Sequence, residues 1–295
     1  MLEKIIFGDN QFFGINHMSE EKEQALSEKF RDLKAITDVI DTAYEAGIRG
    51  FMINTHGRAK DICEYFRRNA SRFSELKLYP SMPYAHKYAN AVAEKGLFGA
   101  LNDMILKNAG VASLMGILSK SGSIIFEKDM IKVMQLLVDM EMKIFKELDV
   151  KVIFLQNIVT DLLLGFGAKD VFVEFTTYIR KKFNIEPGFV TLNMPMLVDF
   201  LLDCGIENPI ICSAINKAGY FMNPDTESYE ITLSKKRFRP IAMSILASGA
   251  VRAEDAVKYV SRLPGIQSIV FGASSQQHIR QTKEMIDHYF FKLPH

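Results

Sequence analysis

Short apolar segments that alternate with helical patterns are the feature that most constrains the fold of this chain. Between these segments apolar residues recur at helical spacing, as in residues 33–46, where the pattern ends at Gly47, a residue favoured after a helix. Strands separated by helices predict βαβ units and a parallel sheet. The segments predicted as strands are residues 5–8, 51–53, 76–82, 152–155, 189–192, 209–214, 241–246 and 269–271.

Eight strand–helix units in 295 residues predict an α/β fold, the (β/α)8 TIM barrel. A doubly wound parallel sheet is the alternative. However, no G-x-G-x-x-G sequence follows an early strand, as a dinucleotide-binding sheet of that kind requires. No internal boundary is rich in proline, glycine or serine, so one domain is predicted over residues 1–295.

The connection between the third and fourth predicted strands is longer than one crossover helix needs. An amphipathic helix at residues 128–148 would suffice, so about 85–126 are predicted to be a helical insertion. Its apolar residues favour a lid over a ligand, a homodimer surface, or extra core packed on the barrel rim. They include Phe98, Leu101, Ile105, Leu114, Met115 and Ile117.

Composition excludes several classes of partner. The net charge is +1, which favours neither nucleic acid nor an anionic membrane. No apolar run is long enough to span a bilayer, and the N-terminus carries no apolar signal segment. Three cysteines without a CxxC pair are typical of reduced thiols in the cytoplasm. No histidines have HxH spacing, so no metal site is predicted.

Polar residues follow the predicted strands, where barrel enzymes build their active sites. His56 is the main acid/base candidate because imidazole titrates near neutral pH, although a loop histidine can also cap the next helix. Asp9 could orient His56, act as a base, or only shape a turn. Asn54 and Gln156 are amides, which bind and orient a substrate. Lys217 follows the sixth strand, where a Schiff-base lysine or a solvated loop lysine could stand.

A second candidate region follows the last predicted strand. Small residues at 272–275 lead into an amphipathic helix that includes Ile279 and Ile286. Bare N–H groups at a helix N-terminus suit a phosphate or another anion. Alternatively, Gly272 only allows the strand and the helix to pack closely.

Several of these segments resemble the aldo-keto reductases. The resemblance is best at residues 240–249 and 263–279, and weaker at 43–51 and 152–161. It implies a barrel that binds NADP(H) or NAD(H) through the loops after its last strands. By this resemblance the cofactor-binding candidates are Asn193, Ser244, Ser248, Gly272, Ser274, Ser275 and Gln277.

The catalytic residues of that family do not match. Its Asp, Tyr, Lys and His correspond here to Met52 or Ile53, His56, the segment 81–83, and Gln156 or Asn157. The favoured interpretation is a diverged reductase-like enzyme acting on a small polar or phosphorylated carbonyl compound. A non-redox lyase, aldolase or isomerase using His56 and Asp9 is one alternative. A catalytically silent ligand-binding relative is another.

Overall fold

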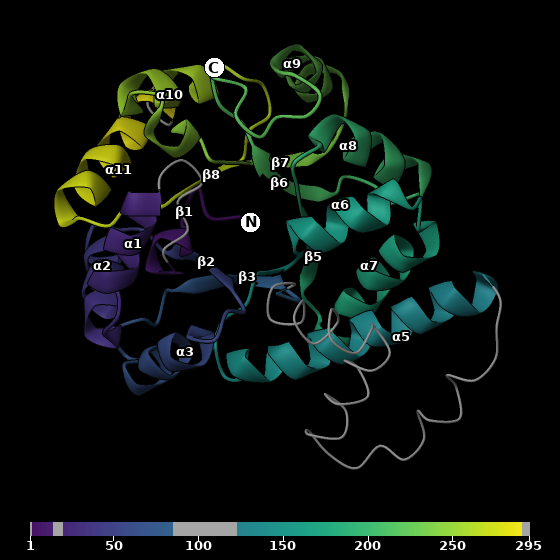
Figure 1. Cartoon of the computed structure of the whole chain (residues 1–295), viewed down its shortest axis with the longest axis horizontal. Helices are drawn as coiled ribbons and strands as arrows, with labels where there is room; N and C mark the ends of the chain where they lie inside the picture. The colour runs from purple at the N-terminus through teal and green to yellow at the C-terminus, as the bar shows by residue number, and fades with distance from the viewer. Residues whose placement is uncertain (1, 14–19, 85–122, 291–295) are drawn as a thin grey trace.

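The computed structural model describes residues 2–13, 20–84 and 123–290. Eight parallel strands follow one another around a closed barrel, and β1 pairs with both β2 and β8 (Figure 1). The predicted (β/α)8 barrel is therefore confirmed. The strands are β1 (Ile5–Phe7), β2 (Gly50–Asn54), β3 (Lys77–Met82), β4 (Val152–Leu155), β5 (Glu186–Thr191), β6 (Ile210–Ala214), β7 (Arg239–Met243) and β8 (Ser268–Phe271).

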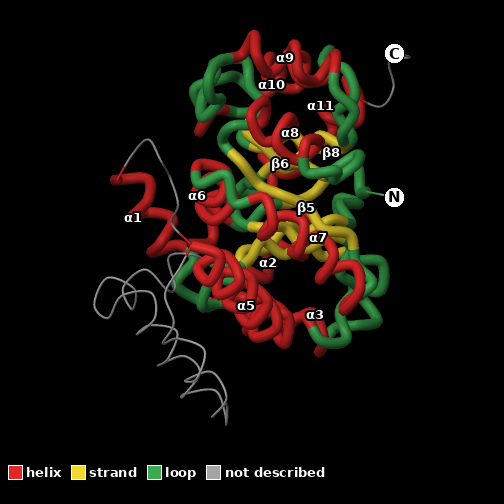
Figure 2. Tube along the Cα trace, turned by 90° about the vertical axis from the view of Figure 1, so that its right-hand side faces the viewer, coloured by secondary structure: helices red, strands yellow, loops and turns green. Residues whose placement is uncertain are grey.

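Helices surround the strands, which lie at the centre of the molecule in Figure 2. The larger helices are α2 (Leu33–Glu45), α3 (Ala59–Arg68), α5 (Ser123–Met142), α7 (Lys169–Phe183), α8 (Met194–Asp203), α9 (Thr226–Lys235), α10 (Ala253–Ser261) and α11 (Gln276–Phe290). Additional helical segments are η1 (Asn10–Phe13), α1 (Glu20–Lys29), η2 (Lys143–Phe145), α6 (Asn157–Gly165) and η3 (Ala247–Gly249). No helix within the described ranges has the length and apolar character needed to cross a membrane.

The barrel interior is filled by alternate residues of the strands. Because successive strand residues point to opposite faces, each strand sends one set of side chains inward and the other toward the helices. In this inward cluster Gly188 on β5 leaves room for the Phe154 ring, because an added Cβ would lie 2.5 Å from that ring. Its buried members are Ile6, Met52, Tyr79, Val152, Phe154, Val190, Ile210, Cys212, Ile241 and Val270.

A second core lies between the strands and the helices. In α2 the buried side chains Ile36, Val39, Ile40 and Ala43 recur at helical spacing and face this layer. Asp32 caps the start of α2 by accepting a hydrogen bond from the Lys34 N–H. The helical spacing predicted this helix from sequence, and its position is confirmed within one residue at its C-terminal end.

The structure corrects several predicted boundaries. A helix that sequence periodicity missed, α6, begins directly after β4 at Asn157. Strand β5 starts at Glu186 rather than at 189, because Pro187 and Gly188 pair with β4 instead of forming a turn. Strand β7 ends at Met243, and the next residue, Ser244, has φ 53°, which breaks the ladder. Most of the predicted insertion, 85–122, lies outside the described residues, and 123–126 belong to α5.

Candidate active site

Asp9 and Asn54 form a hydrogen-bonded pair where β1 and β2 end. The Asn54 backbone N–H donates to Asp9 Oδ2 over 2.6 Å, and Asn54 Nδ2 donates to Asp9 Oδ1 over 2.8 Å. Asp9 is almost fully buried. Burial raises the pKa of its carboxyl to about 7, although both Asn54 hydrogen bonds oppose the shift. Two residues predicted as catalytic therefore meet, and one of them titrates near neutral pH.

His56 follows Asn54 by two residues and lies in an aromatic setting. Its ring stacks on Phe13 with a centroid distance of 4.0 Å and meets the Tyr84 ring edge-on at 5.5 Å. Burial lowers the pKa of the imidazole, and the nearby Arg58 charge lowers it further. The neutral imidazole is thus favoured near pH 7. Arg58 is held in place by donating to the Phe30 carbonyl over 2.6 Å.

Tyr84 completes the cluster; from sequence it was one of the polar strand-end candidates, but no catalytic role was assigned to it. Burial raises the pKa of its phenol, and the charge of Asp9 adds to this effect, which places Tyr84 within electrostatic reach of the carboxylate. Its signal in the sequence was its position directly after the third strand and Pro83. We call Asp9, Asn54, His56 and Tyr84 the β1–β3 cluster.

Gln156 occupies the end of β4. Its side chain shares strand parity with Val152 and Phe154, which belong to the inward cluster, and it is buried. Its N–H donates to the Met82 carbonyl over 3.2 Å, which ties the ends of β3 and β4 together. As an amide, Gln156 can orient a substrate but cannot exchange a proton near neutral pH.

The loop after β6 is built around Asn216. Its side chain accepts from the Tyr220 N–H over 2.9 Å and donates to the Tyr220 carbonyl over 2.8 Å. Burial raises the pKa of the Tyr220 phenol, against an opposing effect of the neighbouring Ser248. The structure thus brings the predicted cofactor residue Ser248 to Tyr220, which the sequence did not single out. Lys217 lies in the same loop with an exposed side chain, the environment of a solvated lysine.

Asn193 has a local structural role at the start of α8. Its side chain accepts from the Met196 N–H over 3.3 Å and caps the helix.

Nearby, Asp161 on α6 accepts from Thr191 Oγ1 over 2.5 Å and from the Leu192 N–H over 3.0 Å. Burial raises the pKa of Asp161. This carboxyl was missed because α6 itself was not predicted.

The turn between β8 and α11 contains the remaining predicted cofactor residues. An added Cβ on Gly272 would lie 2.2 Å from Gln11 Oε1, so the glycine makes room for that side chain. The ammonium group of Lys29, the last residue of α1, donates a hydrogen bond to the Ser274 carbonyl over 2.5 Å. Ser275 Oγ accepts from the His278 N–H over 3.3 Å, and Gln277 is exposed. Ser244 is half-buried after β7.

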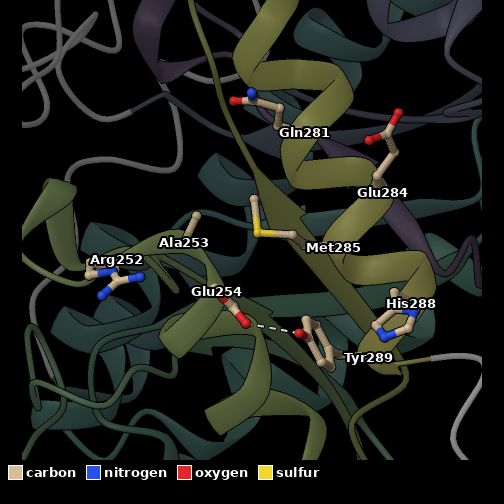
Figure 3. A pocket seen from close by; sticks show the side chains of 8 residues that line it. All are labelled: Arg252, Ala253, Glu254, Gln281, Glu284, Met285, His288 and Tyr289. Atoms are coloured by element: carbon tan, nitrogen blue, oxygen red, sulfur yellow. Dashed lines mark hydrogen bonds between the residues drawn. The ribbon is translucent and has the colours of Figure 1, made fainter.

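A separate groove lies between α10 and α11, with a volume of about 690 Å³ (Figure 3). Glu254 accepts from Tyr289 Oη over 2.9 Å across this groove. Its lining shares no residue with the β1–β3 cluster. Among the side chains that the structure describes, no group of three or more His, Cys, Asp or Glu residues could hold a metal ion.

No family model matches the sequence, and neither does any curated protein. Solved structures do match. A candidate aldo-keto reductase of Pseudomonas aeruginosa shares 12% identity at a TM-score of 0.58, over 97% of this chain and 90% of its own. An aldo-keto reductase of the silkworm, Bombyx mori, shares 11% identity at a TM-score of 0.54, over 98% and 80%. The fold is that of the aldo-keto reductases. A candidate 2,5-diketo-D-gluconic acid reductase B also matches, with 10% identity, a TM-score of 0.56, and coverage of 98% and 83%.

The resemblance predicted from sequence is therefore confirmed for the fold. The strand ends that the resemblance assigns to the reductase residues carry other groups here. Asn54 and His56 follow β2, Tyr84 follows β3, and Gln156 follows β4. Of these, His56 and Tyr84 are ionisable, and each lies in contact with the other. At these strand ends the ionisable groups are therefore an imidazole after β2 and a phenol after β3.

Proposed function

We propose that this chain is an oxidoreductase that acts on a small polar or phosphorylated carbonyl compound with a nicotinamide cofactor. In this proposal Asp9 exchanges the proton at the carbonyl oxygen. One observation carries it: a buried carboxyl with a pKa of about 7 is fixed at the strand ends of a barrel with the aldo-keto reductase fold. A general acid or base works best when its pKa lies near the working pH.

The β1–β3 cluster supplies the proton chemistry. Protonated Asp9 can donate to a carbonyl oxygen during reduction, and its carboxylate can accept the proton of an alcohol during oxidation. Asn54 fixes the orientation of the carboxyl through two hydrogen bonds. The rings of Phe13 and Tyr84 hold His56 and limit the access of water to it. Gln156 can donate from its amide to a substrate oxygen.

The turn from β8 to α11 fits the phosphate of a nicotinamide cofactor. Such a cofactor would supply or accept the hydride. Helix α11 is long enough for a distinct N-terminal dipole and has no acidic residue in its first turn. Lys29 adds a positive charge at Ser274. We expect Lys29, Ser274 and Ser275 to contact the phosphate, with Ser248 and Tyr220 facing the rest of the cofactor.

A fluorescence titration with NADPH and NADH tests cofactor binding. We expect binding below about 1 mM for at least one of them, and a Kd about tenfold weaker in Lys29→Gln, because a charge-assisted contact contributes about 1–2 kcal/mol. Lys235→Gln is the matched control, since Lys235 is an exposed lysine at the end of α9. It should leave the Kd unchanged.

A second candidate function is favoured by the pKa of Asp9 itself. A carboxyl that titrates near pH 7 can also transfer a proton next to a carbonyl without any redox step, as in a lyase, aldolase or isomerase. If neither nucleotide binds at millimolar concentration, the oxidoreductase proposal is wrong and this non-redox function takes its place. If both Asp9→Asn and His56→Ala kept full turnover of an identified substrate, both functions in this form would be excluded.

A further inference from the structure

We infer that Glu141 on α5 is a positioning residue for the Asp9–Asn54 pair, which it holds in place through Thr55. The inference rests on the proposed role of Asp9 in proton transfer. Its basis is the alternation of side chains at the end of β2. Asn54 shares the inward parity of Met52, so the next residue, Thr55, turns toward the helix layer. The two neighbours are therefore held from opposite sides of the strand.

Thr55 and Glu141 are joined by a hydrogen bond between their side chains. The Thr55 hydroxyl donates to Glu141 Oε2, and both side chains are essentially inaccessible to solvent, at 0% and 1% exposure. The Thr55 N–H also points to the Ser81 carbonyl at 3.4 Å. A hydrogen bond to a carboxylate in such a dry setting is stronger and more directional than one in water. It fixes the peptide that links Asn54 to Thr55.

Glu141 occupies an unfavourable position in α5 for a carboxyl group. The residue lies in the last turn of α5, where a negative charge opposes the helix dipole. Burying a carboxyl also costs free energy unless hydrogen bonds compensate it. The buried apolar residues Met134 and Val138 anchor α5 to the core. Through Thr55, Glu141 places a buried polar contact next to Asn54, whose N–H and side chain both bind Asp9.

The consequence for Asp9 is direct. Its pKa depends on burial, which raises it, and on the two Asn54 hydrogen bonds, which lower it. If the Asn54–Thr55 peptide moves, both effects change together with the proton transfer that depends on them. Glu141 thus acts on Asp9 through Thr55 and Asn54, and itself touches neither substrate nor cofactor. It also couples α5, on the outside of the barrel, to the ionisable group at its mouth.

Amide hydrogen exchange and carboxyl ¹³C titration by NMR test the inference on the free protein, without substrate or cofactor. In Thr55→Val we expect the Asn54 amide to exchange at least about tenfold faster, because its hydrogen bond to Asp9 loosens. The titration midpoint of Asp9 should move by about half a pH unit or more. Thr55→Ser keeps the hydroxyl and should retain the wild-type values of both quantities.

Two controls separate positioning from a loss of general stability. Thr160→Val removes another buried threonine hydroxyl, which bonds the Leu155 carbonyl, and should leave Asn54 and Asp9 unchanged. The Ile211 amide in β6 reports global opening. If Asn54 exchange rises only in step with Ile211, or if the Asp9 midpoint does not move, the inference is wrong. Should Thr55→Val fail to fold, Glu141→Gln gives the same two readouts. A failed nucleotide titration would instead remove the oxidoreductase proposal and leave these results intact.

Discussion

At the scale of single residues, Asp9 makes the stability of this protein depend on pH in an unusual direction. Most native carboxyls have lowered pKa values, so acid destabilises the fold. Burial has raised the pKa of Asp9 from 3.8 to about 7. Between these values the folded state binds a proton that the unfolded state does not. The contribution of Asp9 is therefore fully present below its unfolded pKa and is lost as the pH rises to about 7.

Asp9→Asn should remove this pH-dependent contribution to the stability of the fold. Between about pH 5 and about pH 8 the free energy of unfolding of the wild type should fall by about 3 kcal/mol more than that of the variant, since about two pKa units of the shift lie in that range. Urea unfolding of both proteins at the two pH values measures the difference. Taking the difference between the proteins cancels titrations that they share, such as that of His56. Equal pH dependence in both proteins would show that Asp9 is ionised in the fold at pH 5.

At the scale of secondary-structure elements, β5 depends on one glycine. An added Cβ at Gly188 would stand 2.5 Å from Phe154 and 2.8 Å from Val152 inside the barrel. Gly188→Ala should destabilise the protein by about 1–3 kcal/mol, the usual cost of overpacking a filled core. Gly165→Ala is the control, because its Cβ meets nothing within 4 Å at the end of α6. We expect no destabilisation there, measured as the shift in the urea midpoint.

The same elements show what the sequence could and could not predict. All eight strands were placed correctly, because apolar runs between helical patterns mark buried parallel strands. The start of β5 was predicted three residues late. Glycine is unfavourable within a strand, and only the facing Phe154 ring shows why Gly188 suits a strand there. Helix α6 was missed because its exposed positions are apolar and hide its periodicity, as at Ile158 and Leu162.

The candidate site was predictable in part for a related reason. Strand-end position selected Asp9, Asn54, His56 and Gln156. Asp9 and Asn54 prove to be hydrogen-bonded, and His56 contacts Tyr84, which lies within electrostatic reach of Asp9. It could not reveal the Thr55–Glu141 contact, which joins residues 86 positions apart in the chain. Nor could it give the raised pKa of Asp9, which arises from burial rather than from neighbours in sequence.

At the scale of the whole molecule, the three cysteines test whether the chain is one domain, as predicted. Cys212 lies inside the barrel, Cys63 in the helix layer, and Cys204 is partly exposed at the end of α8. Burial raises the pKa of all three thiols, that of Cys63 to about 12. A thiol reagent attacks the thiolate, so buried thiols should react only when the structure opens.

Native-state labelling followed by mass spectrometry of each cysteine should therefore give two groups. Cys204 should react first. Cys63 and Cys212 should react at least about a thousandfold more slowly, through an opening that exposes both. In a single cooperative domain these two rates should agree within about threefold and rise together with urea, because the strands contribute side chains to both cores. If Cys63 reacted more than about tenfold faster than Cys212, the helix layer would open without the barrel, and the chain would not unfold as one unit.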